Sequence, residues 1–316
     1  MLAERTPIAW LAALQSIADL EVRLDHPLAG HTSFRIGGPA QCFASPLNES
    51  AALELWQVAR RYDVQLTVLG GGTNVLIADA GIEGIVVDLC RGFAHLDEAP
   101  RADGSSVWTV GAGCGTGRMV RRAVSRGLRG VEVLAGVPGS LGGALIMNAG
   151  GHDGEIGTVV ESVRIINDGA VQTLTHDAIG FSYRASRFPS DALILEGRLH
   201  LTPGDKDALR DYVRASQTRR KSSQPLTFGN AGSIFKNPPD DFAGRLIDAA
   251  GCKGWQEGDA EVSELHANFI INRGKARARD VAVLAKRVRD AVLAASGITL
   301  EFEVKFLGRF DAGEQL

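Results

Sequence analysis

The chain has 316 residues, a formal net charge of −3 at pH 7, 45% hydrophobic residues and 22% charged residues. This length allows two or three compact units with cores of their own, and the composition is ordinary for a globular protein. The small net charge produces no field that would attract nucleic acid or an anionic membrane, so neither is expected as a partner.

In chain order, the hydrophobic pattern predicts helices and strands in mixed order. Helices are expected over residues 8–20, 49–62 (capped by Asn48 or Ser50), 118–126, 206–219 and 280–296. Strands are expected after Gly38 and over residues 64–69, 82–89, 106–110, 192–197 and 298–307. Asp280 is the predicted cap of the last helix and Gly297 its end.

Other residues bear on location and metal content. The arginines spaced for one helix are interpreted as a solvated helix face: Arg118, Arg121, Arg122, Arg126 and Arg129. The cysteines form no C-x-x-C pair and have no histidine at zinc-like spacing: Cys42, Cys90, Cys114 and Cys252. We therefore expect no metal and buried, reduced thiols. Glu4 and Asp19 interrupt the first apolar stretch and no window approaches a membrane span of ~20 apolar residues, so a cytoplasmic protein is expected.

The first glycine loop follows a predicted strand and reads Gly70-Gly71-Gly72-Thr73-Asn74. Three glycines allow successive backbone N–H groups to converge on an anion, and Thr73 and Asn74 add side-chain donors. The Rossmann spacing fails because Val75 stands at the last glycine position, and no Walker Gly-Lys-Ser/Thr follows. The residues alone leave two interpretations open, a phosphate nest or a plain glycine turn.

A second loop, Gly136-Val137-Pro138-Gly139-Ser140, again combines glycines with a hydroxyl group and continues to Gly143 and Asn148. Two separated glycine loops suit a long ligand with a pyrophosphate, such as FAD, better than a single phosphate. A third run, at residues 111–115, is interpreted as a weaker signal and a packed turn before the basic helix.

Taken in order, these loops resemble those of the UDP-N-acetylenolpyruvoylglucosamine reductases, the MurB family. The similar segments cover nearly the whole chain: Thr32–Ala40, Val68–Ile77, Gly136–Gly139, Tyr183–Phe188, Ala231–Pro238, Ala249–Gly254, His266–Phe269 and Leu300–Val304. Each segment alone is weakly specific, whereas the ordered set is highly specific.

The resemblance implies an α+β fold, with an FAD-binding unit of the vanillyl-alcohol-oxidase (PCMH) type and a C-terminal α+β substrate domain. The expected divisions are residues 1–88 with 301–316 for the first FAD-binding subdomain, 89–213 for the second and 214–300 for the substrate domain. It also implies that FAD is held by both glycine loops, through Gly70, Gly71, Gly72, Thr73, Asn74, Gly136, Pro138, Gly139, Ser140, Gly143 and Asn148.

The implied reaction is the NADPH-dependent reduction, through FAD, of UDP-N-acetylglucosamine enolpyruvate to UDP-N-acetylmuramate, a step of peptidoglycan precursor synthesis. Hydride reaches the vinyl carbon and a proton must follow. Ser233 matches the family's proton donor, although a serine needs a positioned site and a stabilised enolate to act as an acid. Arg184 would hold the carboxylate and the enolate oxygen. Glu303 would polarise the carboxylate, as a protonated acid if it is buried beside other anions.

Further residues are implied around the nucleotide. Lys253, Asn237 and His266 match family positions there; Lys253 is the firmest because a diphosphate favours a cation, and Arg220 is a weaker candidate. Glu301 is expected on the same strand face as Glu303, and the register of the motif decides for Glu303.

The segment between Phe188 and the next predicted strand is short, so the chain resembles the subtype without an inserted tyrosine-bearing loop. A monomer acting on a UDP-sugar and NADPH is expected. Two other functions remain open: a flavin-dependent oxidase of the same fold, and a non-catalytic flavin or nucleotide-binding protein. The first glycine loop lacks the His, Cys or Tyr to which such oxidases often attach FAD. The polar candidates Ser233, Arg184 and Glu303 argue against a mere binding protein.

Overall fold

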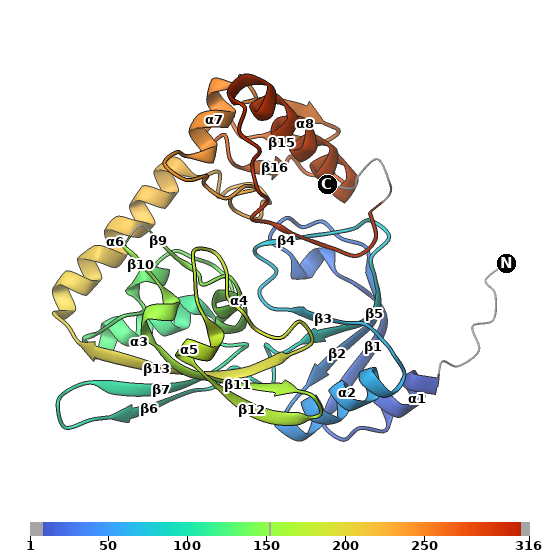
Figure 1. The fold of residues 1–316 in the computed structure, drawn as a ribbon, viewed down its shortest axis with the longest axis vertical. Helices are drawn as coiled ribbons and strands as arrows, with labels where there is room; N and C mark the ends of the chain where they lie inside the picture. Colours follow the sequence, from blue (N-terminus) through green and yellow to red (C-terminus); the bar gives the residue numbers. More distant parts are fainter. Residues whose placement is uncertain (1–8, 152, 311–316) are drawn as a thin grey trace. The chain divides into compact units, whose positions relative to one another are not determined.

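The computed structural model describes residues 9–151 and 153–310, which divide into two compact units (Figure 1). The first unit contains the residues up to Asp25, Gln41–Gly71 and Gly84–Ser216. The second contains His26–Ala40, Gly72–Glu83 and the residues from Gln217 onward. Each unit has its own apolar core. Within the described ranges, no helix is both long and apolar enough to cross a membrane.

The first unit is built on two sheets. One has the order β1-β2-β5-β3, formed by Leu20–Pro27, Pro39–Pro46, Ile82–Asp88 and Leu66–Leu69. The other has the order β12-β11-β13-β7-β6, formed by Ala170–Thr175, Val160–Asn167, Leu193–Pro203, Ser106–Gly111 and Leu96–Pro100, with β8 (Leu128–Arg129) paired to β13. The short strands β9 (Gly150–Gly151) and β10 (Gly154–Glu155) form a separate pair.

The helices of the first unit fix the loops between the strands. They are α1 (Ala9–Gln15), α2 (Glu49–Arg61), α3 (Thr116–Arg126), α4 (Leu141–Ile146) and α5 (His176–Ile179), with 3₁₀ turns η2 (Glu132–Leu134) and η3 (Ile156–Val159). A Cβ atom added to Gly197 of β13 would lie 3.3 Å from Leu141 and 3.5 Å from Leu145. Helix α4, which directly follows the second glycine loop, is therefore packed closely on the sheet.

The second unit combines helices with small sheets. Its elements are η1 (Ala29–His31), β4 (Val75–Ile77), α7 (Ala243–Ala249), β14 (Gln256–Glu257), β15 (Ala260–Val262), β16 (Ile270–Asn272), α8 (Ala278–Ser296) and β17 (Lys305–Leu307). Strand β17 pairs in parallel with β4, and β14-β15-β16 form an antiparallel sheet. Helix α6 (Lys206–Ser223) begins in the first unit and ends in the second.

Most of the elements predicted from the sequence are present. Asn48 caps α2 by accepting a hydrogen bond from the Ala51 N–H at 2.9 Å, and Gly297 ends α8 in a left-handed conformation. The arginines of the basic helix and Arg129 are exposed. All four cysteines are free; three are buried and Cys90 is half-buried, and burial raises the pKa of Cys42 to about 11.

Several predicted bounds and one predicted cap differ from the structure. Within the described residues the first helix covers only Ala9–Gln15, and Leu20 already begins β1; Ile8 lies outside those residues. The last strand is confined to Lys305–Leu307. Asp280 is the third residue of α8 and not its cap: its carboxylate accepts from the N–H of Arg277, which is the N-cap residue. The three-part domain division stays a prediction.

Candidate active site

The two glycine loops touch each other in the first unit. A Cβ atom added to Gly71 would lie 2.7 Å from the Cα atom of Gly139, and one added to Gly70 would lie 2.5 Å from the Ser140 hydroxyl oxygen. A side chain on Gly71 would therefore push the loops apart, and one on Gly70 would displace the Ser140 hydroxyl. The two predicted phosphate-binding loops are thus in direct contact with each other.

The second loop is held in shape by its own glycines and by Thr116. Gly136 and Gly139, which flank Val137 and Pro138, have φ angles of 79° and 125°, where other residues would be strained. The Thr116 hydroxyl donates to the Val137 carbonyl at 2.6 Å, and its N–H donates to the Gly139 carbonyl at 3.0 Å. Gly143, on α4, has more room, since an added Cβ would lie 3.8 Å from the Ser140 hydroxyl.

The third glycine run is a packed turn, as predicted. A Cβ atom added to Gly111 or Gly113 would collide with a backbone carbonyl, of Phe93 or Leu89 respectively. The run also supports the second loop, because the Ala112 carbonyl accepts from the Gly142 N–H at 2.8 Å.

Arg184 lies at the tip of a tight turn in the first unit and is connected to Asn148 through Glu155. One guanidinium nitrogen of Arg184 lies 3.9 Å from the Glu155 carboxylate, and another donates to the Gly150 carbonyl at 3.4 Å. The Asn148 amide nitrogen donates to the other Glu155 oxygen at 2.6 Å, and its oxygen accepts from the Gly157 N–H at 2.9 Å. The arginine side chain remains 20% exposed. It is thus oriented but still accessible to a ligand.

The remainder of the first glycine loop belongs to the second unit. Gly72 has a φ angle of 60°, and a Cβ atom there would collide with the His31 carbonyl. The Ser33 N–H donates to the Gly72 carbonyl at 3.0 Å, which joins the loop to the Thr32–Ala40 segment. The Asn74 amide nitrogen donates to the Glu303 carbonyl at 3.0 Å. Thr73 lies between these two anchored residues.

Ser233 and Glu303 are carried on two segments of the second unit that pair in antiparallel fashion. The Glu303 N–H donates to the Ile234 carbonyl at 2.9 Å, and the Lys236 N–H donates to the Glu301 carbonyl at 2.8 Å. The rings of Phe235 and Phe302 stack with centroids 4.9 Å apart. Ser233 directly precedes Ile234. The pairing therefore brings two of the three predicted catalytic residues into one neighbourhood.

The two glutamates near the end of the chain have different environments. Glu301 has a side chain that is 73% exposed and pairs with the Lys236 ammonium at 2.6 Å. Glu303 is half-buried. Residues 301–304 form a single bridge and a bend instead of a regular strand. The regular strand predicted here is therefore absent, and the placement of both glutamates on one strand face stays a prediction.

Three of the predicted nucleotide residues gather around helix α7. The Asn237 amide oxygen accepts from the Ala243 N–H at 3.0 Å at the start of the helix. The Lys253 ammonium pairs with Asp248, in the last turn, at 2.8 Å. A Cβ atom added to Gly244 would lie 3.3 Å from the His266 ring. The structure thus brings Asn237, Lys253 and His266 to a single short helix.

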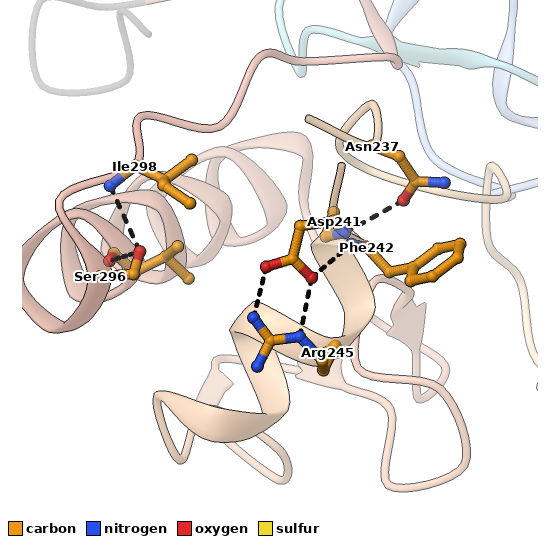
Figure 2. A network of polar contacts seen from close by, with 8 residues as sticks. Asn237, Asp241, Phe242, Arg245, Ser296 and Ile298 are labelled. Atoms are coloured by element: carbon orange, nitrogen blue, oxygen red, sulfur yellow. Dashed lines mark hydrogen bonds and ion pairs between the residues drawn. The ribbon is translucent and has the colours of Figure 1, made fainter. Parts of the chain in front are cut away.

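Figure 2 shows how the start of α7 is fixed. Asp241 accepts from the Phe242 N–H at 2.7 Å and forms an ion pair with Arg245. These hydrogen bonds, that from Arg245 first, lower the pKa of Asp241 to about 2. The Asn237 side chain bonds the same turn from the opposite side to Arg245 (Figure 2). The amide of Asn237 is therefore held by a turn that is itself rigidly bonded.

Burial lowers the pKa of two of the predicted nucleotide-binding residues, His266 and Arg220. Burial, and secondarily the positive charge of Lys253, lowers the pKa of His266. Burial also lowers the pKa of the Arg220 guanidinium, whose Nε donates to the amide oxygen of Gln224 at 2.8 Å. A desolvated cation is stabilised by an anionic ligand, which is consistent with the predicted contact to a nucleotide.

The sequence did not reveal three residues that fix the segments and side chains of the candidate site. Asn268 is buried and bonds the backbone of Phe235 on both sides, and the Asn230 side chain accepts from the Gly232 N–H at 3.0 Å. Glu155, which orients Arg184, was also missed. Asn268 and Asn230 lie in or beside segments on which the family resemblance rests. The available signal was their residue type, an amide side chain within or beside a motif.

Comparisons with known proteins identify the family. Residues 224–307 match the family described as the UDP-N-acetylenolpyruvoylglucosamine reductase C-terminal domain, and residues 40–175 match an FAD binding domain. The chain is 43% identical over 289 residues to UDP-N-acetylenolpyruvoylglucosamine reductase 2 of Symbiobacterium thermophilum, covering 91% of this chain and 92% of that protein. The chain belongs to the UDP-N-acetylenolpyruvoylglucosamine reductase family.

Other relatives agree. The reductase of Anaeromyxobacter sp. is 42% identical over 96% of this chain and 94% of its own length, and that of Bacillus subtilis is 38% identical over 91% and 94%. The crystal structure of the reductase (MurB) from Thermus caldophilus superposes with a TM-score of 0.77 at 34% identity, covering 91% of this chain and 98% of that one. The predicted family and the predicted α+β fold with an FAD-binding domain are confirmed.

Proposed function

We propose that the protein uses NADPH and bound FAD to reduce UDP-N-acetylglucosamine enolpyruvate to UDP-N-acetylmuramate, a cytoplasmic step of peptidoglycan precursor synthesis. The observation that carries the proposal is the pairing of the Ser233 segment with the Glu303 segment, tied to the first glycine loop by the Asn74–Glu303 hydrogen bond. This pairing supports the proposal that an acid candidate and a carboxyl group act beside the residues that hold the flavin.

The residues of the glycine loops fit FAD. Gly70 and Gly71 form a cradle with Gly139 and Ser140, in which a Cβ atom added to Gly70 or Gly71 would lie within 2.7 Å of the second loop. Bound FAD supplies, at the substrate's vinyl group, the hydride received from NADPH. We assign to the same cofactor the remaining residues of both loops: Gly72, Thr73, Asn74, Gly136, Pro138, Ser140 and Gly143. Asn148 is assigned to the cofactor site as well, where it orders the backbone that follows the second loop.

Three side chains are proposed to stabilise the negative charge that develops on the substrate and to supply the proton. Hydride addition leaves an enolate-like charge conjugated with the substrate carboxylate. Arg184, held by Glu155, binds that carboxylate and stabilises the charge as it develops. Ser233 donates its hydroxyl proton to the adjacent carbon. Glu303, which is half-buried, is proposed to polarise the same carboxylate.

Four residues are proposed to hold the UDP moiety. Lys253 and Arg220 bind the diphosphate as cations, and Asn237 and His266, which lie near the first turn of α7, contact the nucleotide. In domain terms, residues 1–88 with 301–316 and residues 89–213 bind FAD, and residues 214–300 bind the substrate. The protein acts as a monomer, with no nucleic-acid or membrane partner.

The test is anaerobic and aerobic turnover of the purified yellow protein. We expect NADPH oxidation that requires the enolpyruvyl substrate and yields one UDP-N-acetylmuramate per NADPH. NADPH oxidation that depends on oxygen and not on the enolpyruvyl substrate would instead identify an oxidase. Tight flavin binding with no turnover on any addition would identify a binding protein.

A further inference from the structure

The buried side chain of Asn268 holds the segment that follows Ser233. Its amide oxygen accepts from the Phe235 N–H at 3.0 Å, and its amide nitrogen donates to the Phe235 carbonyl at 2.8 Å. The Asn268 carbonyl accepts from the Ile234 N–H at 2.9 Å. Asn268 is 3% exposed and Phe235 is 1% exposed. One residue therefore satisfies three backbone groups in the two residues after Ser233, away from water.

The other contacts of the segment leave Ser233 little freedom. On its N-terminal side, Gly232 has a φ angle of 77° and its N–H is fixed by Asn230. On its C-terminal side, the Ile234 carbonyl accepts from the Glu303 N–H. Asn268 therefore replaces a neighbouring strand on the edge opposite Glu303. A side chain can do this because an amide offers one donor and one acceptor, which match the C=O and N–H groups of one residue.

We infer that Asn268 is a positioning residue for proton transfer: it sets the place of the Ser233 hydroxyl relative to the substrate. The inference rests on the proposed function, in which Ser233 donates the proton. Buried polar groups that lose a partner are costly, so the Phe235 carbonyl would shift to find another donor if the Asn268 amide were removed. Because Phe235 is only two residues from Ser233, that shift would move the hydroxyl.

Asn268→Asp gives the sharpest test, because it keeps the shape and changes one donor. A buried carboxyl group has a raised pKa. When protonated it can accept from the Phe235 N–H and donate to the Phe235 carbonyl, as the amide does; when ionised it repels that carbonyl. The variant should therefore behave like the natural protein at low pH and lose its function as pH rises. Asn268→Ala should be slow at every pH.

The experiment measures two half-reactions of the holoenzyme by anaerobic stopped flow. NADPH reduces the flavin in the first, and the enolpyruvyl substrate reoxidises it in the second. We expect the first to be unchanged in both variants. The second should slow on the order of 10²-fold in Asn268→Ala, the cost of misplacing a reacting group by about 1 Å. In Asn268→Asp, the rate divided by that of the natural protein should recover as pH falls.

A matched control is Val288→Ala, which removes a buried side chain (1% exposed) from α8 in the core that also contains Phe235. It should leave both half-reactions unchanged with no pH-dependent ratio. Second half-reactions at the natural rate in both Asn268 variants, or equal slowing of both half-reactions, would overturn the inference. If the enolpyruvyl substrate did not reoxidise the flavin of the natural protein, the proposed function itself would be wrong. This failure is therefore distinguishable from a failure of the inference about Asn268.

Discussion

Replacing Gly71 with Ala should weaken FAD binding selectively. The added Cβ atom would lie 2.7 Å from the Gly139 Cα atom, whereas ordinary contact begins at 3.4 Å, so the two loops must separate by 3.4 − 2.7 = 0.7 Å. The obstructing atom is backbone and cannot rotate away. Overpacking of this kind costs roughly 1–3 kcal/mol. If that cost falls on the FAD-bound geometry, the dissociation constant rises roughly 5- to 150-fold.

The assay is titration of the apoprotein with FAD, followed by flavin fluorescence, alongside thermal unfolding of the apoprotein. Gly70→Ala should have a smaller effect, because its Cβ would meet the Ser140 hydroxyl, which can adopt another rotamer. Gly117→Ala in α3, whose Cβ would meet only the flexible end of Arg121 at 3.3 Å, is the control and should bind FAD normally. If Gly71→Ala bound FAD with the natural affinity, the proposal that these two loops hold FAD would be refuted.

Two further predictions concern the surroundings of α7. Lys253→Ala should raise the KM for the UDP-sugar about tenfold, because hydrogen bonds to charged groups contribute about 1.5–3 kcal/mol and this one is partly screened by water. Steady-state kinetics would measure the change, with the exposed Lys275→Ala as the control. An unchanged KM would show that Lys253 does not bind the substrate. His266 has a folded-state pKa below its unfolded value of about 6.5, so its contribution to stability is present above that pH and is lost as pH falls. Urea unfolding of His266→Gln should therefore show a smaller loss of stability between pH 7 and pH 5 than the natural protein, and identical slopes would contradict the assignment.

Local signals explain the parts of the fold that could be predicted. Helix α2 was found with its cap because Asn48 and the apolar spacing act within a few residues. Strand β1 was missed although Leu20, Val22 and Leu24 alternate with Glu21, Arg23 and Asp25, because the helix predicted over residues 8–20 ended inside this pattern; β1 is an edge strand with no buried residue. Edge strands tolerate such charges, and the sequence alone does not reveal which strand lies at the edge.

The candidate site shows the same division. The motifs located Ser233 and Glu303, but their pairing joins segments about 70 residues apart, and no local pattern encodes it. The last strand does not extend back to Ile298, as was predicted, because the backbone of residues 301–304 forms hydrogen bonds with an irregular segment instead of a regular strand. Asn268 escaped notice because its role depends on burial against Phe235, which only the folded chain creates.

The most direct test of the account is the pair of half-reactions in Ser233→Ala. Removing the hydroxyl takes away the proton and leaves the glycine loops intact, and Ser233 is not among the residues proposed to hold FAD. We predict that NADPH reduces the bound flavin at nearly the natural rate, while reoxidation by the enolpyruvyl substrate slows by about 10²- to 10⁴-fold, the usual contribution of a positioned acid. Reoxidation at the natural rate would contradict the assignment of Ser233 as the proton donor.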